Sequence, residues 1–253
     1  MPKASTLTLA TAILAGSIIS ASAADMPVAP PPPPPYDWTG WYIGFGIGAA
    51  NHEVDWAFAN LTTTFNNSWD TTRVQLHAGS QYMFGMGWGG IVLGVDLAAA
   101  FPLEDRIGAA ACPNVAFLCE SRFNALYTVG GKLGVAFAPF LGFGGGFMIY
   151  GTGGLAIGDI NTHSRLIATD ALLSTDGDLQ DGWYVGAGLD WAAYKGNGID
   201  LILGFEYKHI EFDATRNGLL FGLVDVGFTR DVTLTTDQFM AKASFKFGGP
   251  RWW

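Results

Sequence analysis

The sequence predicts an all-β protein: a transmembrane antiparallel up-and-down β-barrel of about eight strands. Composition gives the first indication, because glycine contributes 35 residues and aromatic and charged residues each contribute 14%. The second is that no internal stretch approaches the roughly 18 consecutive apolar residues of a spanning helix. The third is a period-two alternation of apolar and polar residues from Gly40 onward, which is typical of strands with two different faces.

The N-terminus has the pattern of a secretory signal peptide. Lys3 provides the positive end, residues 7–19 form an apolar run, and Ala21-Ser22-Ala23 is a small-residue cleavage site. We therefore expect a signal peptide over residues 1–23, with a lone transmembrane anchor as the alternative. Export places the mature chain in an oxidising compartment, where disulfides persist.

Residues 24–37 are expected to form a periplasmic proline-rich linker. Pro27 and the run Pro30–Pro35 favour an extended polyproline II conformation of about 3.1 Å per residue. A spacer is the simpler interpretation, and a docking site for a proline-recognising partner is the alternative.

Eight segments alternate in the region expected to form the barrel, residues 38–249, before a C-terminal tail of residues 250–253. In the fourth segment, for example, Phe123 and Tyr127 fall on the apolar face and Arg122, Asn124 and Lys132 on the polar face. No formal charge falls on an apolar face in the eight segments, which cover approximately residues 41–49, 73–82, 91–97, 122–137, 147–157, 183–191, 201–208 and 239–247.

That absence of charge favours a membrane barrel over a soluble β protein. A charge facing mid-bilayer costs about 2–4 kcal/mol, whereas a soluble sheet shows a charged face to water. The charges on the polar face are therefore expected in the lumen, where opposite signs should pair and fill the barrel. Glycines 44, 46, 48, 186 and 188 leave room for a thread of water. The expected lumen charge network is Arg73, Asp96, Arg122, Lys132, Asp190, Glu206, Lys208, Lys242 and Lys246.

Connections between the segments alternate in length. Long loops are expected at residues 52–71, 100–121, 159–181 and 213–236, and short turns at 85–89, 138–146 and 194–198. Long loops are typical of the extracellular side, so both termini are expected in the periplasm. Aromatic residues gather on the turn side, where we expect an interfacial belt that includes Trp38 and Trp41.

Few residues point to chemistry. Cys112 and Cys119 are expected to form a disulfide, and a metal pair would need two further ligands. His77 lies on the lumen face, where a hydrogen-bonded histidine is favoured over a metal ligand. His209 and Glu211 share a face, but a lipid hydrolase would also need a serine nucleophile, and none is near them in sequence. No cofactor and no enzymatic activity are therefore expected.

Several motifs resemble a known family. They are Asp37-Trp38-Thr39-Gly40-Trp41-Tyr42-Ile43-Gly44, Gly130-Gly131-Lys132-Leu133-Gly134-Val135-Ala136-Phe137, Tyr150-Gly151-Thr152-Gly153-Gly154-Leu155-Ala156, Gly182-Trp183-Tyr184-Val185-Gly186-Ala187-Gly188-Leu189, Phe205-Glu206-Tyr207 and Phe245-Lys246-Phe247. Over residues 36–249 the chain resembles the small outer-membrane surface-antigen (porin-like) β-barrel proteins of alphaproteobacteria, which include hemin-binding members.

The resemblance implies an outer-membrane protein of a Gram-negative bacterium. The leading functional hypothesis is a structural barrel that contributes to envelope integrity and presents acidic loops at the surface. The alternatives are a narrow porin-like channel and a loop-mediated binder of hemin or of a host surface. Expected partners are outer-membrane lipids and lipopolysaccharide, the barrel-assembly machinery and peptidoglycan. The net charge of −9 argues against a nucleic-acid partner.

Overall fold

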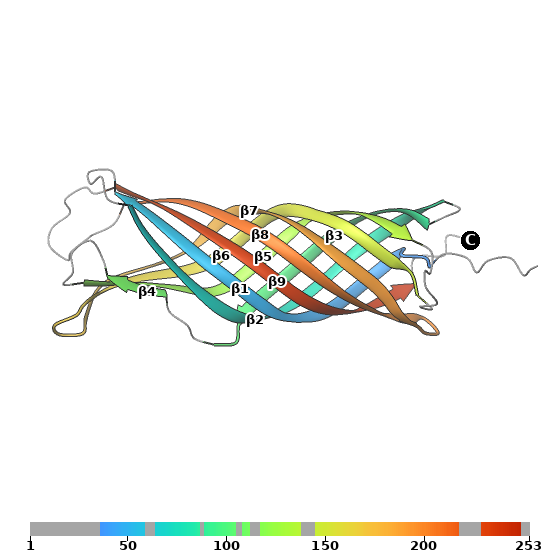
Figure 1. Cartoon of the computed structure of the whole chain (residues 1–253), viewed down its shortest axis with the longest axis horizontal. Coiled ribbons are helices and arrows are strands. Elements are labelled where there is room, and N and C mark those ends of the chain that lie inside the picture. Colours follow the sequence, from blue (N-terminus) through green and yellow to red (C-terminus); the bar gives the residue numbers. More distant parts are fainter. Residues whose placement is uncertain are drawn as a thin grey trace, which may run out of the picture. The chain divides into compact units, whose positions relative to one another are not determined.

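A computed structural model describes residues 36–58, 64–86, 89–104, 108–111, 117–137, 145–217 and 229–248. The expected signal peptide (1–23), the linker up to residue 35 and the tail (250–253) lie outside these ranges. The described residues form β-strands, shown in Figure 1: β1 (Gly40–Phe58), β2 (Thr64–Met86), β3 (Gly89–Pro102), β4 (Gly108–Ala111), β5 (Phe117–Phe137), β6 (Phe147–Leu166), β7 (Ala171–Lys195), β8 (Ile199–Asn217) and β9 (Thr229–Gly248).

Eight of these strands close into a barrel. Strands that follow one another in the ring pair antiparallel, and β1 pairs with β9 to close it. The short β4 lies between β3 and β5 in sequence, but β3 and β5 pair directly with each other. β4 pairs with residues 118–121 of β5, beyond the point where the β3–β5 pairing stops at Leu126. The expected all-β, up-and-down barrel of about eight strands is thus confirmed. β4 is an addition that lies inside the predicted loop 100–121.

The two ends of the barrel differ. At one end, here called the turn end, β1 starts and β9 stops, with Gly40 opposite Gly248, and β7 reaches β8 through residues 196–198. At the other, the hairpin end, strands continue well past the 9–11 residues or so that a tilted strand needs to cross a bilayer. β7, for example, has 25 residues.

These extensions correct the loop predictions. Most of the expected loops 52–71 and 159–181 is strand: β1 runs to Phe58, and β6 and β7 continue to a turn at residues 167–170. Outside the lipid the outer face no longer needs to be apolar. On β1, Glu53 and Asp55 face outward and Val54 faces inward, so the apolar outer face that marks a strand of the belt in the sequence is lost there.

An apolar belt surrounds the barrel. On β1 the exposed side chains Trp41, Ile43, Phe45 and Ile47 alternate with inward-facing positions. The same alternation is found on the other seven strands of the ring, with the outward residues those predicted from the sequence except on β5. Exposed carboxylates begin where this belt ends, with Glu53 and Asp55 on β1. The belt therefore has the apolar, charge-free surface that lipid requires.

The exception on β5 is a correction to the lumen charge network. The register between β5 and β6 shifts between Phe123 and Ala125, which leaves Asn124 as one extra residue. Such a bulge moves every side chain beyond it to the opposite face of the strand. Phe123 is consequently buried inside the barrel, and Arg122 is half-buried outside the lumen layer where the sequence pattern placed it.

The lumen is filled in three layers. An apolar cluster near each end encloses a polar layer that holds most of the buried charges. The turn-end cluster comprises Tyr36, Trp38, Val92, Ala136, Met148, Tyr150, Ala192 and Ile202. The hairpin-end cluster comprises Val54, Ala100, Phe123, Leu126, Ala156, Ile160, Tyr184, Ile210, Phe212 and Leu234, with Trp69 packed against it.

Trp38 corrects a second expectation. The sequence suggested an interfacial ring, but Trp38 is fully buried in the turn-end cluster. Its carbonyl accepts a hydrogen bond from Gln81 Nε2 at 2.8 Å, and its ring packs edge-on against Tyr36 at 4.9 Å between centroids. The segment before β1 thus folds into the mouth of the barrel. A period-two pattern cannot predict this position, because the segment is not a strand. Trp41, by contrast, is exposed as expected.

Candidate functional site

The polar layer of the lumen is the candidate functional site, and Glu206 is its centre. Glu206 on β8 is almost completely buried. Its Oε2 accepts hydrogen bonds from Lys242 Nζ and from the Tyr150 hydroxyl, each at 2.8 Å. Lys208 Nζ lies 3.1 Å from the other carboxylate oxygen, and Lys242 also donates to Tyr150 at 2.6 Å. One carboxylate therefore balances two buried ammonium groups from neighbouring strands.

A second group of charges lies across the layer. Lys132 on β5 is 3.7 Å from Asp190 on β7, and its ammonium lies over the rings of Tyr42 and Tyr150 at 4.8 and 4.3 Å. Asp96 on β3 accepts a hydrogen bond from the Tyr42 hydroxyl at 2.7 Å. Cation–π contacts of this kind partly replace the hydration that a buried ammonium loses.

Glycines on the inner wall are the reason the phenol rings fit. A β-carbon at Gly79 would stand 2.3 Å from the Tyr42 hydroxyl, and one at Gly188 would stand 2.3 Å from the Tyr150 hydroxyl. The space expected to admit a thread of water at Gly188 is thus occupied by a tyrosine. Glycine in these strands serves close side-chain approach across the lumen.

Only some of the predicted network residues meet in this layer. They are Asp96, Lys132, Asp190, Glu206, Lys208 and Lys242. Arg73 lies at its hairpin-end edge, with its guanidinium 4.1 Å from the centre of the Phe123 ring. Lys246 lies at the turn end, 3.5 Å from Asp200 and donating to the carbonyls of Asp37 and Thr39.

At the turn end Tyr36 links the segment before β1 to the barrel. Its hydroxyl donates to Asp200 Oδ2 at 2.7 Å. Burial, followed by the hydrogen bond to Asp200, raises the pKa of the Tyr36 phenol well above its ordinary value. The phenol therefore keeps the proton that this hydrogen bond needs.

Two sets of lumen residues lie outside the predicted charge network. Tyr42, Tyr150 and Tyr184 face inward, as their positions on the polar faces predict, but the network did not include them. His52 is fully buried, hydrogen-bonded to Thr236 Oγ1 at 2.8 Å and Thr71 Oγ1 at 3.0 Å, and stacked on Phe123. It was missed because residues 52–71 were interpreted as a loop.

The candidate chemical groups behave as structural residues. His77 is buried and its Nε2 lies 2.7 Å from Ser244 Oγ, the hydrogen-bonded arrangement favoured from the sequence. His209 pairs with Asp237 at 2.8 Å rather than with Glu211, and its cross-strand neighbours are Val185 and Asp237, neither of them the serine that a lipid hydrolase would need. Among the described residues no group of three or more His, Cys, Asp or Glu could hold a metal ion.

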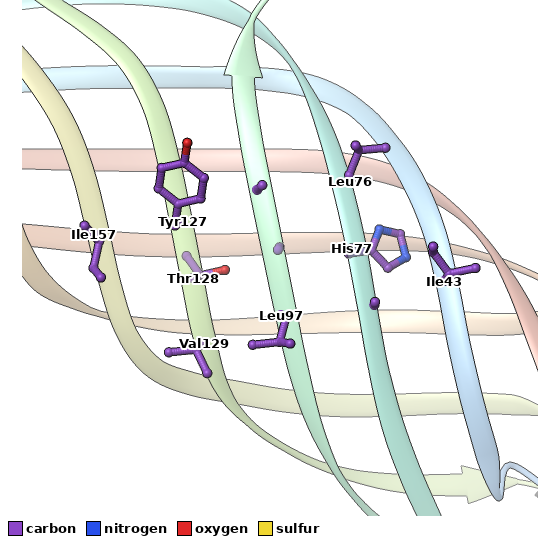
Figure 2. A pocket seen from close by; sticks show the side chains of 11 residues that line it. Ile43, Leu76, His77, Leu97, Tyr127, Thr128, Val129 and Ile157 are labelled. Carbon is purple, nitrogen blue, oxygen red and sulfur yellow. The ribbon is translucent and has the colours of Figure 1, made fainter.

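An apolar pocket of about 450 Å³ opens on the outer wall of β2, β3 and β5 (Figure 2). Its lining includes Leu76, Leu97, Tyr127 and Val129 and the small residues Ala78 and Ala99. The four larger residues belong to the apolar belt, so in a membrane the pocket faces acyl chains. His77, which also lines the pocket, is buried, and its Nε2 lies 2.7 Å from Ser244 Oγ.

The disulfide between Cys112 and Cys119 stays a prediction, because Cys112 and the Cys119 side chain lie outside the described part of the structure. Thiol labelling of intact cells with a membrane-impermeant maleimide should give no product at either cysteine until a reductant is added. Labelling without reductant would contradict the bridge. A Cys112→Ser variant, which must leave Cys119 free, is the positive control.

The protein is a closed antiparallel barrel with a charge-free apolar belt and a filled lumen. These features define a transmembrane β-barrel of the class found in bacterial outer membranes. The family model described as "Outer membrane protein beta-barrel domain" matches residues 11–247, and the chain belongs to this family. It is an outer-membrane protein. Within the described residues no helix is long and apolar enough to cross a membrane.

The chain is also similar to curated relatives and to solved structures. The chain is 29% identical over 233 residues to the 31 kDa outer-membrane immunogenic protein of Brucella melitensis biotype 1, covering 83% of this chain and 93% of that protein. It is similar to OprG from Pseudomonas aeruginosa, with 15% identity, 84% and 98% of the two chains covered and a TM-score of 0.43. It is also similar to Ail of Yersinia pestis, with 13% identity, 81% and 99% covered and a TM-score of 0.35.

Proposed function

We propose that the protein is a closed, non-enzymatic structural barrel of the outer membrane that presents an acidic surface to the cell exterior. The observation that carries this proposal is the three-layered filling of the lumen. Beside the turn-end cluster, to which Tyr150 belongs, Glu206, Lys242, Lys208 and Tyr150 link β6, β8 and β9 across the lumen. A pore would require the polar layer to continue to both mouths, and the clusters interrupt it.

The surface role rests on the hairpin end. Strands project there beyond the apolar belt, and their exposed carboxylates include Glu53, Asp55, Asp70, Asp170 and Asp181. With the turn end and both termini in the periplasm, this acidic extension faces outward. The name of the Brucella relatives, an outer-membrane immunogenic protein, supports surface presentation. Lipids and lipopolysaccharide are the partners that the belt itself would contact.

Osmotic swelling of proteoliposomes tests the closed barrel against the narrow channel. Vesicles that contain the refolded wild-type protein should swell in isotonic arabinose no faster than protein-free vesicles. Vesicles that contain a general porin provide the positive control. Faster swelling, in proportion to the amount of monomeric protein inserted, would favour the channel and overturn the proposal.

A further inference from the structure

Arg73 is a buried cation for which the described structure provides no polar partner. Its side chain is 0% exposed, and Nε, Nη1 and Nη2 all lack a hydrogen-bond partner. The Phe123 ring covers one face of the guanidinium. Arginine cannot lose its proton in a protein, so its charge cannot be avoided, and an uncompensated charge in a low-dielectric interior is costly.

The other charges of the polar layer are already committed. Glu206 pairs with Lys242 and Lys208, Asp190 pairs with Lys132, and Asp96 accepts from Tyr42. Among the described residues between the two apolar clusters, four cations, counting Arg73, therefore face three carboxylates. Glu120, a further buried carboxylate, lies on the hairpin side of Phe123 and makes no hydrogen bond to Arg73.

The neighbours of Arg73 add unused hydrogen-bond donors. Gln75 is the next inward-facing residue on β2, and its Oε1 accepts from Gln238 Nε2 at 3.0 Å. The amide nitrogen of Gln75 has no acceptor, and Oε1 of Gln238 has no donor. Arg73 and Gln75 are alternate residues on the inward face of β2, and a buried positive charge with an unused N–H group on the same face is a site for an anion.

We propose that the barrel binds a small monovalent inorganic anion of the chloride class at Arg73 and Gln75. One negative charge balances the one uncompensated cation, whereas a phosphate would reverse the imbalance. The hairpin-end cluster, with Phe123 against the guanidinium, closes the apolar side of the site. Crowding of the lumen by tyrosine rings favours an ion over an organic anion.

Chloride-dependent stability tests the site, because a ligand that binds the native state alone raises its stability in a saturable way. The urea midpoint of the refolded barrel is measured at constant ionic strength while sodium chloride replaces sodium gluconate. The wild-type midpoint should rise and saturate, bromide should substitute for chloride, and Arg73→Met should abolish the rise. Lys246→Met removes a buried cation that has its own partners at the turn end, and it should keep the rise.

A direct measurement does not depend on the stability of a variant. Crystals of the wild-type protein grown in sodium bromide should show an anomalous bromide peak within hydrogen-bond distance of the Arg73 guanidinium. A chloride-independent wild-type midpoint, a rise that persists in Arg73→Met, or bromide peaks confined to the protein surface would each overturn the proposal.

Discussion

Replacing Glu206 by glutamine should destabilise the barrel by about 3–5 kcal/mol, because removal of one partner leaves buried charges uncompensated. Glutamine keeps the shape of the side chain and can still hydrogen-bond to Tyr150. It cannot balance Lys242 and Lys208, which lie 2.8 and 3.1 Å from the carboxylate. The measurement is the free energy of unfolding in urea, followed by tryptophan fluorescence in lipid vesicles.

Two further variants show that charge causes the loss. Glu53→Gln removes an exposed carboxylate at the hairpin end and should change the stability by no more than about 0.5 kcal/mol. The double variant Glu206→Gln with Lys242→Met removes one of the ammonium groups that Glu206→Gln leaves uncompensated. It should therefore be more stable than Glu206→Gln alone. Equal small effects of Glu206→Gln and Glu53→Gln would mean that the lumen is hydrated and its charges are screened.

A lysine in the middle of the apolar belt should cost nearly as much. Leu133 on β5 is 58% exposed and pairs with Leu93 of β3 and Gly151 of β6, well inside the belt. Leu133→Lys therefore places an ammonium group against lipid, at a cost of about 2–4 kcal/mol near the bilayer midplane. The free energy of unfolding in vesicles and the fraction of protein that inserts should both fall.

The matched control is a leucine of equal exposure beyond the belt. Leu179 on β7 is 61% exposed and pairs with Asp159 in the hairpin-end extension. Leu179→Lys faces water there and should leave insertion unchanged. If both lysines impaired insertion equally, the assignment of the belt along the barrel axis would be wrong.

The sequence predicted the part of the fold that lipid constrains. Along β1 and β9 a residue faces either lipid or the lumen, so Trp41 and Phe245 could be assigned from alternation alone. The same logic placed Asp96, Lys132, Asp190 and Glu206 inside the barrel, because a charge on the other face would be too costly. The pairing of each cation with its carboxylate depends on the strand register around the ring. A local sequence pattern does not contain that register.

The failures occur where that constraint ends. Outside the lipid the extensions of β6 and β7 lack the apolar outer face that marks a strand of the belt, and they resemble loops in the sequence. The extra residue at Asn124 reverses the faces of β5, which puts Phe123 inside and Arg122 out of the lumen layer. Trp38 enters the lumen from a segment with no strand periodicity. In each case long-range packing decides a position that the local sequence leaves open.

The proposed barrel has no continuous aqueous path through its lumen, and a planar-bilayer recording distinguishes it from a channel. Eight strands leave room for little more than side chains, whereas wide aqueous channels need about 16. With monomeric wild-type protein inserted, we expect no steady conductance. Large, steady conductance steps that persist with monomeric protein would mean that the lumen is open.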